Sequence, residues 1–562
     1  MARFSFDLED LNGRNGLVIN DASVATSLSS FTSGADYNGD GIDDLVISPL
    51  SGVSLNQNLQ IIYGQERFPT NFNLSNADST TVSSSPSTLI SVPISISELD
   101  FNGDGVDDLF VTGVEQSASE EVALTARLFF GDDELPATIN AGNFNGTNGL
   151  EFVGDQSILL AQSIDINGDD NDDLIVSTID AEATDDSALN SYVLLGSDRD
   201  FNPTFNPTTV NGRNGFAIEA TSLSLSFSFG AEGDINDDGI NDLTLNSFGV
   251  PDRANTGSIE DVQSSSSILF GSETFPASVD ADDLDGENGF TIVNSDNDAP
   301  GSEFTVSSIT EDVNGDGVSD LLISQGYLEE SADGSIPDIG DPAAGDSGEV
   351  SNQRVFTIFG REEFNPVFDL VFLNGNNGFE IVNSASDESN LISSRTLDLN
   401  NDGLQDFVVR DEESSQTYVV FGSEDFGATI DLADLDGDNG FALAEEPDFV
   451  YTTSNVGDVN ADGIDDLILE TDIDKTYVVL GTEDDFGAEF KPTRRNANAL
   501  VIFAQDAETS ITDIIDLNGD GADDLVYTPG IVADPFGLAE PENNDVPGVQ
   551  VVFGDSDLGT AS

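Results

Sequence analysis

The side chains in this sequence that are best suited to chemistry are the oxygen-bearing residues of a short repeated loop. The first copy covers residues 36–44 and reads D-Y-N-G-D-G-I-D-D, with Asp, Asn, Asp and Asp at positions 1, 3, 5 and 9. Alternate residues of such a loop turn their oxygens inward, position 7 offers its backbone carbonyl, and glycine at position 6 makes the sharp bend. This spacing is typical of a chain that folds around a hard cation.

The loop occurs eight times, at residues 36–44, 100–108, 165–173, 234–242, 312–320, 398–406, 458–466 and 516–524. We expect each to bind one Ca²⁺ in a structural role, up to eight in all, because Mg²⁺ demands a tighter octahedron and keeps more water. The alternative is an Asx-rich turn without metal. The expected ligands are Asp36, Asn38, Asp40, Ile42 and Asp44; Asp100, Asn102, Asp104, Val106 and Asp108; Asp165, Asn167, Asp169, Asn171 and Asp173; Asp234, Asn236, Asp238, Ile240 and Asp242; Asp312, Asn314, Asp316, Val318 and Asp320; Asp398, Asn400, Asp402, Leu404 and Asp406; Asp458, Asn460, Asp462, Ile464 and Asp466; and Asp516, Asn518, Asp520, Ala522 and Asp524.

Three other loop positions vary among the copies. Asp170 replaces glycine at position 6 of the third loop, where we expect strain and a weaker site. In three loops position 4 is Asp237, Asn401 or Ala461. We expect these replacements of glycine to cost the site little, because position 4 is not a ligand. The acids at position 8 are expected to face solvent or to lie in the outer coordination shell; they are Asp43, Asp107, Asp172, Asp465 and Asp523.

The composition narrows the possible partners and chemistry. The 562 residues carry 108 Asp and Glu against 15 Lys and Arg, a formal charge of −93, which repels nucleic acids and anionic membranes and attracts cations. The absence of Cys and His excludes thiolate and imidazole chemistry and ordinary zinc sites. The acidic surface suits a calcium-rich or salt-rich medium, and we expect an extracellular or cell-surface location; an acidic halophile-type protein is the rival interpretation.

The regular spacing of the loops predicts a repeat architecture. Each repeat contains four short β-like segments, which in the fifth repeat cover residues 288–293, 303–309, 320–324 and 354–360. Eight repeats of four strands predict a single all-β domain over residues 1–562, an eight-bladed β-propeller of four-stranded antiparallel blades. The last blade lacks an outer strand, and we expect Gly16–Asn20 to supply it by pairing with residues 549–553. The longest connections between second and third strands are expected at residues 325–353 and 529–547. They are either flexible acidic insertions or binding loops.

Targeting and membrane signals are not visible in the sequence. The first seven residues, M-A-R-F-S-F-D, have no apolar run, so they do not read as a signal peptide. No stretch approaches the apolar length of a membrane span, and we expect no transmembrane segment.

The loop and the strand that ends in Phe-Gly together resemble the FG-GAP repeat, found in the propeller of integrin α chains and in many bacterial surface proteins. The loop motif D-x-N-G-D-G-x-D-D-L and endings such as Phe130-Gly131 and Phe553-Gly554 carry the resemblance. It implies Ca²⁺ in the loop between the two inner strands of each blade, with partners binding the opposite face. This chain differs in having eight repeats where integrins have seven, and it contains no Arg-Gly-Asp.

The leading hypothesis is a non-enzymatic, calcium-stabilised, secreted propeller that serves as an adhesion, matrix or surface-assembly module. Its expected partner is a protein or polysaccharide on the face opposite the calcium loops, with homo-oligomerisation into a sheath or fibre as a further possibility. The alternative is a propeller that binds or cleaves polysaccharide with paired carboxylates. A pocket at the central channel with two carboxylates outside the calcium loops and aromatic side chains beside them would favour the alternative.

Overall fold

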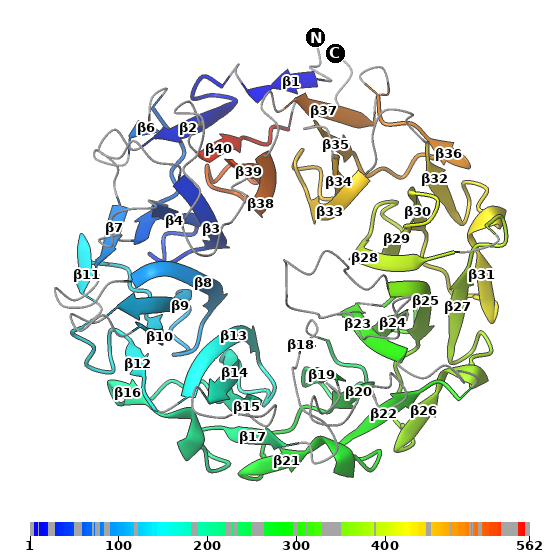
Figure 1. Cartoon of the computed structure of the whole chain (residues 1–562). Helices are drawn as coiled ribbons and strands as arrows, with labels where there is room; N and C mark the ends of the chain where they lie inside the picture. Colours follow the sequence, from blue (N-terminus) through cyan, green and yellow to red (C-terminus); the bar gives the residue numbers. More distant parts are fainter. Residues whose placement is uncertain are drawn as a thin grey trace, which may run out of the picture.

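A computed structural model shows the architecture of the chain (Figure 1). It describes residues 5–8, 11–20, 28–49, 59–69, 72–73, 79–83, 90–116, 122–140, 142–154, 156–180, 189–199, 201–219, 228–229, 233–248, 264–295, 302–310, 312–328, 350–386, 389–444, 451–471, 475–493, 496, 498–503, 509–529 and 549–556. Within these residues, no helix has the length and apolar character that crossing a membrane requires.

Eight separate sheets form a closed ring, as the sequence predicts, and we number them blades 1 to 8 in the order of their loops (Figure 1). From the centre outward, blades 1 to 4 consist of β3 (Leu28–Ala35), β4 (Asp44–Pro49), β5 (Leu59–Ile62), β7 (Ser79–Ser83) and β11 (Thr138–Asn140); β8 (Ile90–Leu99), β9 (Asp108–Gln116), β10 (Val122–Phe129), β12 (Leu150–Phe152) and β16 (Thr204–Phe205); β13 (Gln156–Ile164), β14 (Asp173–Asp180), β15 (Leu189–Leu194), β17 (Phe216–Glu219) and β21 (Ser278–Asp280); and β18 (Ser228–Phe229), β19 (Leu243–Phe248), β20 (Ser264–Leu269), β22 (Gly289–Val293) and β26 (Val367–Asp369).

Blades 5 to 8 have the same order. They consist of β23 (Ser302–Thr310), β24 (Asp320–Leu328), β25 (Val350–Ile358), β27 (Gly378–Val382) and β31 (Thr429–Asp431); β28 (Leu391–Leu397), β29 (Asp406–Asp411), β30 (Gln416–Val420), β32 (Gly440–Leu443) and β36 (Glu489–Phe490); β33 (Tyr451–Gly457), β34 (Asp466–Thr471), β35 (Lys475–Val479), β37 (Ala499–Phe503) and β1 (Ser5–Asp7); and β38 (Thr509–Ile515), β39 (Asp524–Pro529), β40 (Val549–Val552), β2 (Gly16–Asn20) and β6 (Phe72–Asn73). Four 3₁₀ turns in the described chain follow outer segments: η4 (Pro207–Thr209), η6 (Ala281–Asp283), η7 (Leu370–Phe372) and η8 (Leu432–Asp434).

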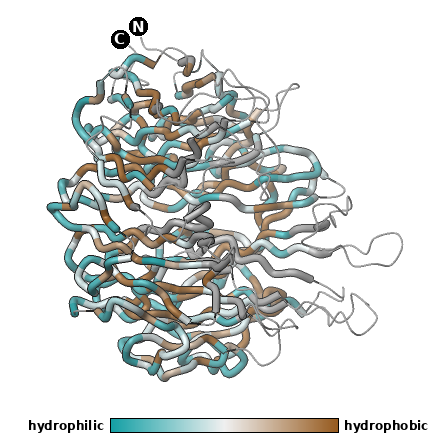
Figure 2. The backbone as a smooth tube through the Cα atoms, turned by 60° about the vertical axis from the view of Figure 1, so that its left-hand side comes forward, coloured by the Kyte–Doolittle hydropathy of each residue, from teal (hydrophilic) through white to brown (hydrophobic). Residues whose placement is uncertain are grey.

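The second strand of each blade is apolar on both faces because a neighbouring blade covers each face. In β29 and in β34, five of the six residues are buried. This burial explains why these strands read as nearly continuous apolar runs instead of alternating with polar residues. Figure 2 shows the hydrophobic segments inside the blades and the hydrophilic ones along the turns.

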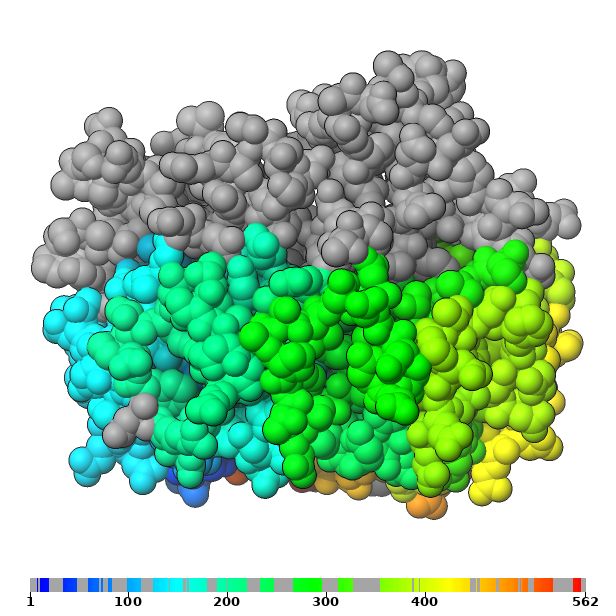
Figure 3. Space-filling view, turned by 90° about the horizontal axis from the view of Figure 1, so that it is seen from below, coloured from blue at the N-terminus to red at the C-terminus, as the bar shows by residue number. Residues whose placement is uncertain are grey.

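Four antiparallel strands per blade are confirmed, and the structure adds a short fifth strand that the sequence did not reveal. This strand belongs to the chain of the following blade and runs parallel to the outer strand, as β26 does along β22, where Thr291 pairs with Val367. This parallel pairing joins each blade to the next. Figure 3 views the ring from its side and shows the blades following one another around the circumference.

The N-terminal segment closes the ring by joining two blades of the C-terminal half (Figure 1). β2 pairs antiparallel with β40, with Gly16 opposite Val552 and Ile19 opposite Val549, which confirms the predicted closure. In addition, β1 pairs in parallel with β37 of blade 7, with Phe6 opposite Ile502. The closure therefore has two strands, on adjacent blades.

Phenylalanine side chains fill the spaces between neighbouring blades. Phe364, which follows β25, stacks on Phe290 of β22 with ring centroids 4.2 Å apart, and Phe486 lies on Phe441 of β32 at 4.9 Å. Each such pair joins the segment after a Phe-Gly or Leu-Gly ending to the preceding blade. These contacts add to the hydrophobic clusters that span two blades each.

The predicted long connections are shorter than expected at their described ends. β24 continues to Leu328 and β25 begins at Val350, with Tyr327 opposite Ser351, because Gln325, Gly326 and Tyr327 extend the hairpin. β39 likewise continues to Pro529. The remaining parts of the predicted insertions, residues 329–349 and 530–547, lie outside the described residues.

Candidate metal centres in the inner loops

Each acidic loop joins the first and second strands of its blade, as residues 36–44 join β3 to β4. The first three strands of every blade are antiparallel, so all eight loops lie at the same end of their sheets. The second strand then ends at the opposite face, where the second-to-third connection begins. This arrangement places the loops and the far ends of the second strands on opposite faces of the ring.

The carboxylate at position 1 organises the loop backbone. Asp36 accepts hydrogen bonds from the N–H groups of Asp40 (3.0 Å) and Gly41 (2.6 Å), and the carboxylate of Asp40 accepts one from the N–H of Ile42 (3.0 Å). The same three bonds recur in all eight loops. The predicted ligands at positions 1 and 5 are therefore brought together in each loop by a shared turn.

The carboxylate at position 9 is fully buried in every blade, with 0 % of its surface exposed. Asp44 accepts a hydrogen bond from the N–H of Gly64 (2.9 Å), the glycine that ends the third strand. The corresponding glycine does the same in the seven other blades. A Cβ atom at Gly64 would lie 2.3 Å from the carbonyl oxygen of Asp43, which explains why glycine follows the aromatic residue here.

Position 3 takes two orientations. The amide of Asn38 donates to both carboxylate oxygens of Asp44 (3.0 Å each); the asparagine does the same to position 9 in loops 3, 5 and 8 and donates to one oxygen of Asp108 in loop 2. In loops 4, 6 and 7 the asparagine Oδ1 instead accepts from the backbone N–H of position 5, as in Asn236. These are the three loops in which position 4 is not glycine.

Burial raises the pKa of the position-9 carboxyls far above the ordinary value near 4. The pKa reaches about 8 for Asp44, Asp173, Asp242, Asp320 and Asp466 and about 9 for Asp524, and it is raised well above the ordinary value for Asp108 and Asp406. Repulsion by the carboxylates at positions 1 and 5 of the same loop adds to the burial effect in every case. A cation in the loop would relieve both effects.

Carboxylate, amide and carbonyl oxygens are the ligand types that a hard cation prefers. The side chains of the loops are not arranged as a coordination shell in this structure. No group of three or more acidic side chains in the described part of the chain is arranged so that it could hold a metal ion. The reason is that the carboxylates and Asn38 are engaged with loop N–H groups and with one another. Binding would require the asparagine to turn its oxygen inward, as Asn236 has already done toward its own loop.

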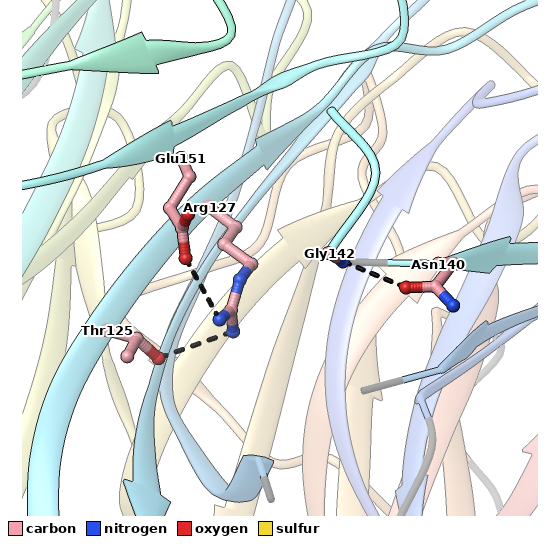
Figure 4. A network of polar contacts seen from close by, with 5 residues as sticks. All are labelled: Thr125, Arg127, Asn140, Gly142 and Glu151. Atoms are coloured by element: carbon pink, nitrogen blue, oxygen red, sulfur yellow. Dashed lines mark hydrogen bonds and ion pairs between the residues drawn. The ribbon is translucent and has the colours of Figure 1, made fainter. Parts of the chain in front are cut away.

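Basic side chains do not neutralise these loops in the ion pairs that the structure describes. Arg127 of β10, which is 5 % exposed, pairs with Glu151 of β12 at 3.2 Å and also donates to Thr125, while Asn140 accepts from the N–H of Gly142 nearby (Figure 4). Arg354 pairs with Glu380 in blade 5. Both ion pairs lie between strands, and neither involves a loop carboxylate.

The acids at position 8 have a function that sequence reasoning missed. Asp107 accepts a hydrogen bond from the backbone N–H of Asp36, the first residue of the preceding blade's loop, at 2.8 Å. The equivalent bonds join Asp172 to Asp100, Asp465 to Asp398, Asp523 to Asp458 and Asp43 to Asp516. These side chains are half-buried between blades and not simply solvent-facing, so that part of the prediction is corrected. The signal in the sequence was an additional acid immediately before the position-9 aspartate in five of the eight loops.

Backbone conformation corrects the expectation for position 4. Asp237, Asn401 and Ala461 have φ of 58°, 54° and 54°, in the left-handed region that costs an ordinary residue about 1–2 kcal/mol. A residue other than glycine at position 4 therefore carries backbone strain, contrary to the expectation. Asp170 at position 6 has φ of 62°, as expected for a residue that replaces glycine there.

Comparison with known proteins gives only distant structural neighbours. No family model matches the chain, and no curated protein matches it. The chain is similar to a solved polysaccharide lyase, Uly1, at 9 % identity and a TM-score of 0.33, covering 84 % of this chain and 98 % of that one. It is also similar to the rhamnogalacturonan lyase YesW at 10 % identity and a TM-score of 0.26, covering 98 % and 91 %. Likeness at this level is too distant to assign an activity.

The prediction that the chain is not an enzyme is nevertheless contradicted, because both of these neighbours are lyases. We withdraw that prediction. The resemblance to FG-GAP repeats gains no support from the family comparison, whereas the eight-bladed propeller predicted from the eight repeats is observed.

Proposed function

We propose that the chain is a calcium-stabilised β-propeller in which each inner loop holds one Ca²⁺. The expected ligands are the side chains at positions 1, 3, 5 and 9 and the carbonyl at position 7. The ion would supply positive charge to three carboxylates that otherwise repel one another. Its role would be structural, because it joins the loop to the first and second strands of the blade.

The observation that carries this proposal is the buried carboxylate at position 9. Eight such groups have no exposed surface, each faces two further carboxylates of its loop, and burial raises the pKa of each. Burying an uncompensated charge is expensive, so a protein that retains eight of these groups requires either protons or cations there. Near neutral pH in a calcium-containing medium, Ca²⁺ binding neutralises these carboxylates more favourably than protonation does.

We further propose that the propeller acts outside the cell or on its surface as an adhesion, matrix or assembly module of the FG-GAP type. The formal charge of −93 and the eight loops favour a medium rich in calcium. Protein or polysaccharide partners would bind the face opposite the loops. Self-association into a sheath or fibre would use the same face.

The experiment for this function is a binding survey with the intact protein, in which purified matrix proteins and a glycan array are probed in calcium and in excess chelator. Specific binding in calcium that disappears on chelation supports the proposal. Binding that is unchanged by a chelator known to remove all bound calcium contradicts it.

The second candidate is a propeller that binds or cleaves polysaccharide. The observation that favours it is a small cavity at the circumference lined by Glu363 and Asp369 together with phenylalanine side chains. The predicted place was the central channel, so the position differs. Asp369 is also engaged in the fold, because it accepts hydrogen bonds from the N–H groups of Ser295 (3.1 Å) and Val371 (3.2 Å).

A further inference from the structure

Arg361 stands at a position where the other seven blades have a smaller or acidic side chain. The residue after the glycine of each third strand is Gln65, Asp132, Ser197, Ser272, Arg361, Ser423, Thr482 or Asp555. In all eight blades its backbone N–H donates to the carbonyl of position 2 in the preceding loop, as Arg361 does to Ile235 at 2.8 Å. This shared contact uses only the backbone, so it does not explain why blade 5 has an arginine here.

The guanidinium of Arg361 lies among aromatic rings. Its central carbon is 4.6 Å from the ring centroid of Phe364 and 5.0 Å from that of Phe368. Its Nε and Nη2 atoms are buried and have no hydrogen-bond partner among the described residues. Burial also lowers the pKa of Arg361. The chain has only 15 basic residues, and neither of the ion pairs found among its described residues involves Arg361.

The 3₁₀ turn beside Arg361 is also different from its equivalents. η7 reads L-V-F, whereas η4, η6 and η8 read P-T-T, A-D-D and L-A-D. Phe372 is 68 % exposed and Val367 is 53 % exposed, and they are among the few large apolar side chains exposed in the described chain. Exposed apolar groups that adjoin a cavity are typical of a binding site.

A cavity of about 190 Å³ lies between these two features and is lined in part by Val367, Phe368 and Asp369 of β26. Figure 1 shows β26 at the outer edge of the ring, beside β22 of blade 4. The walls of the cavity include Arg361, Phe364, Val367, Phe368 and Phe372. This volume is below the ~300–1,000 Å³ of sites for drug-sized ligands, so it suits one ring and not an extended molecule.

We propose that this cavity binds a carboxylate carried on a single six-membered ring. The carboxylate becomes the counter-ion of Arg361 and accepts a hydrogen bond from Nη1, the guanidinium nitrogen that is not among the buried atoms. The ring packs against Phe372 and Val367. The inference is independent of calcium, and it goes beyond the stabilising role proposed for the loops.

The acidic residues of the cavity wall do not already fulfil this role. Asp369 caps η7, and its Oδ1 atom accepts from the N–H groups of Ser295 and Val371; these hydrogen bonds lower its pKa. Glu363 is exposed at the cavity and forms no ion pair with Arg361 in the structure. An incoming carboxylate therefore meets an arginine whose charge is still uncompensated.

The test uses ligand-observed NMR and calorimetry on the full chain in calcium, with four probes. D-glucuronate and benzoate carry a carboxylate on a ring, D-glucose is the neutral ring, and acetate is the carboxylate without a ring. We expect glucuronate, benzoate or both to bind about tenfold or more tightly than glucose and acetate. Tighter binding of glucuronate identifies the ligand as an acidic sugar, and tighter binding of benzoate identifies it as an aromatic acid. Equal binding of charged and neutral probes, or no binding of any, overturns the proposal.

Two variants and a matched control locate the site. Arg361→Gln and Phe372→Ala should each weaken binding of the preferred probe by about tenfold or more. Arg67→Gln removes one positive charge from the corresponding, exposed segment of blade 1 and should leave binding unchanged. Phe372 is exposed, so its variant keeps the test valid if Arg361→Gln does not fold. Wild-type affinity in both folded variants contradicts the assignment, whereas an unchanged calcium-dependent melt shows that the calcium proposal is unaffected.

Discussion

At the scale of single residues, the buried carboxylate at position 9 joins three parts of a blade. Asp466 accepts hydrogen bonds from the N–H of Val459 in its own loop and from the N–H of Gly481 at the end of the third strand. It also begins the second strand, β34. Burial and the nearby carboxylates of Asp462 and Asp458 raise its pKa to about 8, and neither ion pair of the described residues involves it.

The raised pKa values predict how the stability of the calcium-free protein changes with pH. Because the folded pKa is about 8 for Asp44 and Asp466, against an ordinary value near 4 in the unfolded chain, the folded state binds more protons between these limits. The stabilisation is therefore complete below pH ~4 and is lost as the pH rises through ~8. Urea unfolding in chelator from pH 5 to pH 8 should show a falling free energy of unfolding. In saturating calcium the fall should disappear or reverse; a calcium-free protein that gains stability with pH would contradict this.

The strained residue at position 4 predicts a stabilising substitution. Ala461 has φ of 54°, a conformation that glycine adopts without strain and that glycine has at position 4 of five other loops. We expect Ala461→Gly to raise the free energy of unfolding by up to about 1 kcal/mol, after allowance for the greater freedom of glycine in the unfolded chain. Thermal unfolding in calcium measures the effect. A lower melting temperature would show that the left-handed conformation at Ala461 is not a source of strain.

At the scale of elements, each loop is attached both to its own sheet and to the neighbouring blade. The half-buried carboxylate of Asp107 accepts from the N–H of Asp36, and the N–H of Asp132 donates to the carbonyl of Tyr37. Both bonds join blade 2 to the loop of blade 1. The loops therefore form a continuous hydrogen-bonded layer on one face of the ring.

Two substitutions at Asp107 separate the hydrogen bond from the charge. Asp107→Ala leaves the part-buried N–H of Asp36 without its acceptor, and we expect a loss of about 1–3 kcal/mol in calcium. Asp107→Asn keeps an acceptor oxygen, as Asn241 would at the same position of blade 4, and should be tolerated much better. Chemical unfolding compares the two variants. Equal losses would mean that the charge of Asp107, and not its hydrogen bond, joins the blades.

Much of each blade could be predicted from local sequence because the signals are local. The loop motif, the glycine after the third strand and the short β-branched runs are each contained within about ten residues, and they correctly predicted four antiparallel strands. The fifth strand, such as Val367–Asp369, has no signal of its own, because only the neighbouring blade's edge makes it a strand. The contact from Asp107 to Asp36 and the cavity at Arg361 also depend on a neighbouring blade, so neither could be inferred from one repeat.

At the scale of the whole molecule, the ring is closed by non-covalent pairing of the chain's two ends. Leu17 of β2 pairs with Val551 of β40, and Phe6 of β1 pairs with Ile502 of β37. This closure was predictable for β2, because the last repeat visibly lacks an outer strand. The pairing of β1 was not predicted, because its three residues carry no pattern that distinguishes them from a loop.

The closed ring also gathers the charge of the loops on one face. The eight loops together contain the predicted ligands of up to eight cations, and eight divalent ions would offset only 16 of the 93 net negative charges. The loops nevertheless hold the carboxylates that are fully buried. Cation binding there should stabilise the fold more than screening of the exposed acids does.

Calcium binding measured together with thermal unfolding tests the central claim most directly. The protein is stripped with chelator, dialysed against calcium and assayed for bound metal by mass spectrometry, and its melting temperature is recorded before and after. We predict close to eight calcium ions per chain, with the third loop the weakest, and a melting temperature that rises by many degrees on binding. A chain that binds no calcium, or that melts at the same temperature with and without it, would contradict the account.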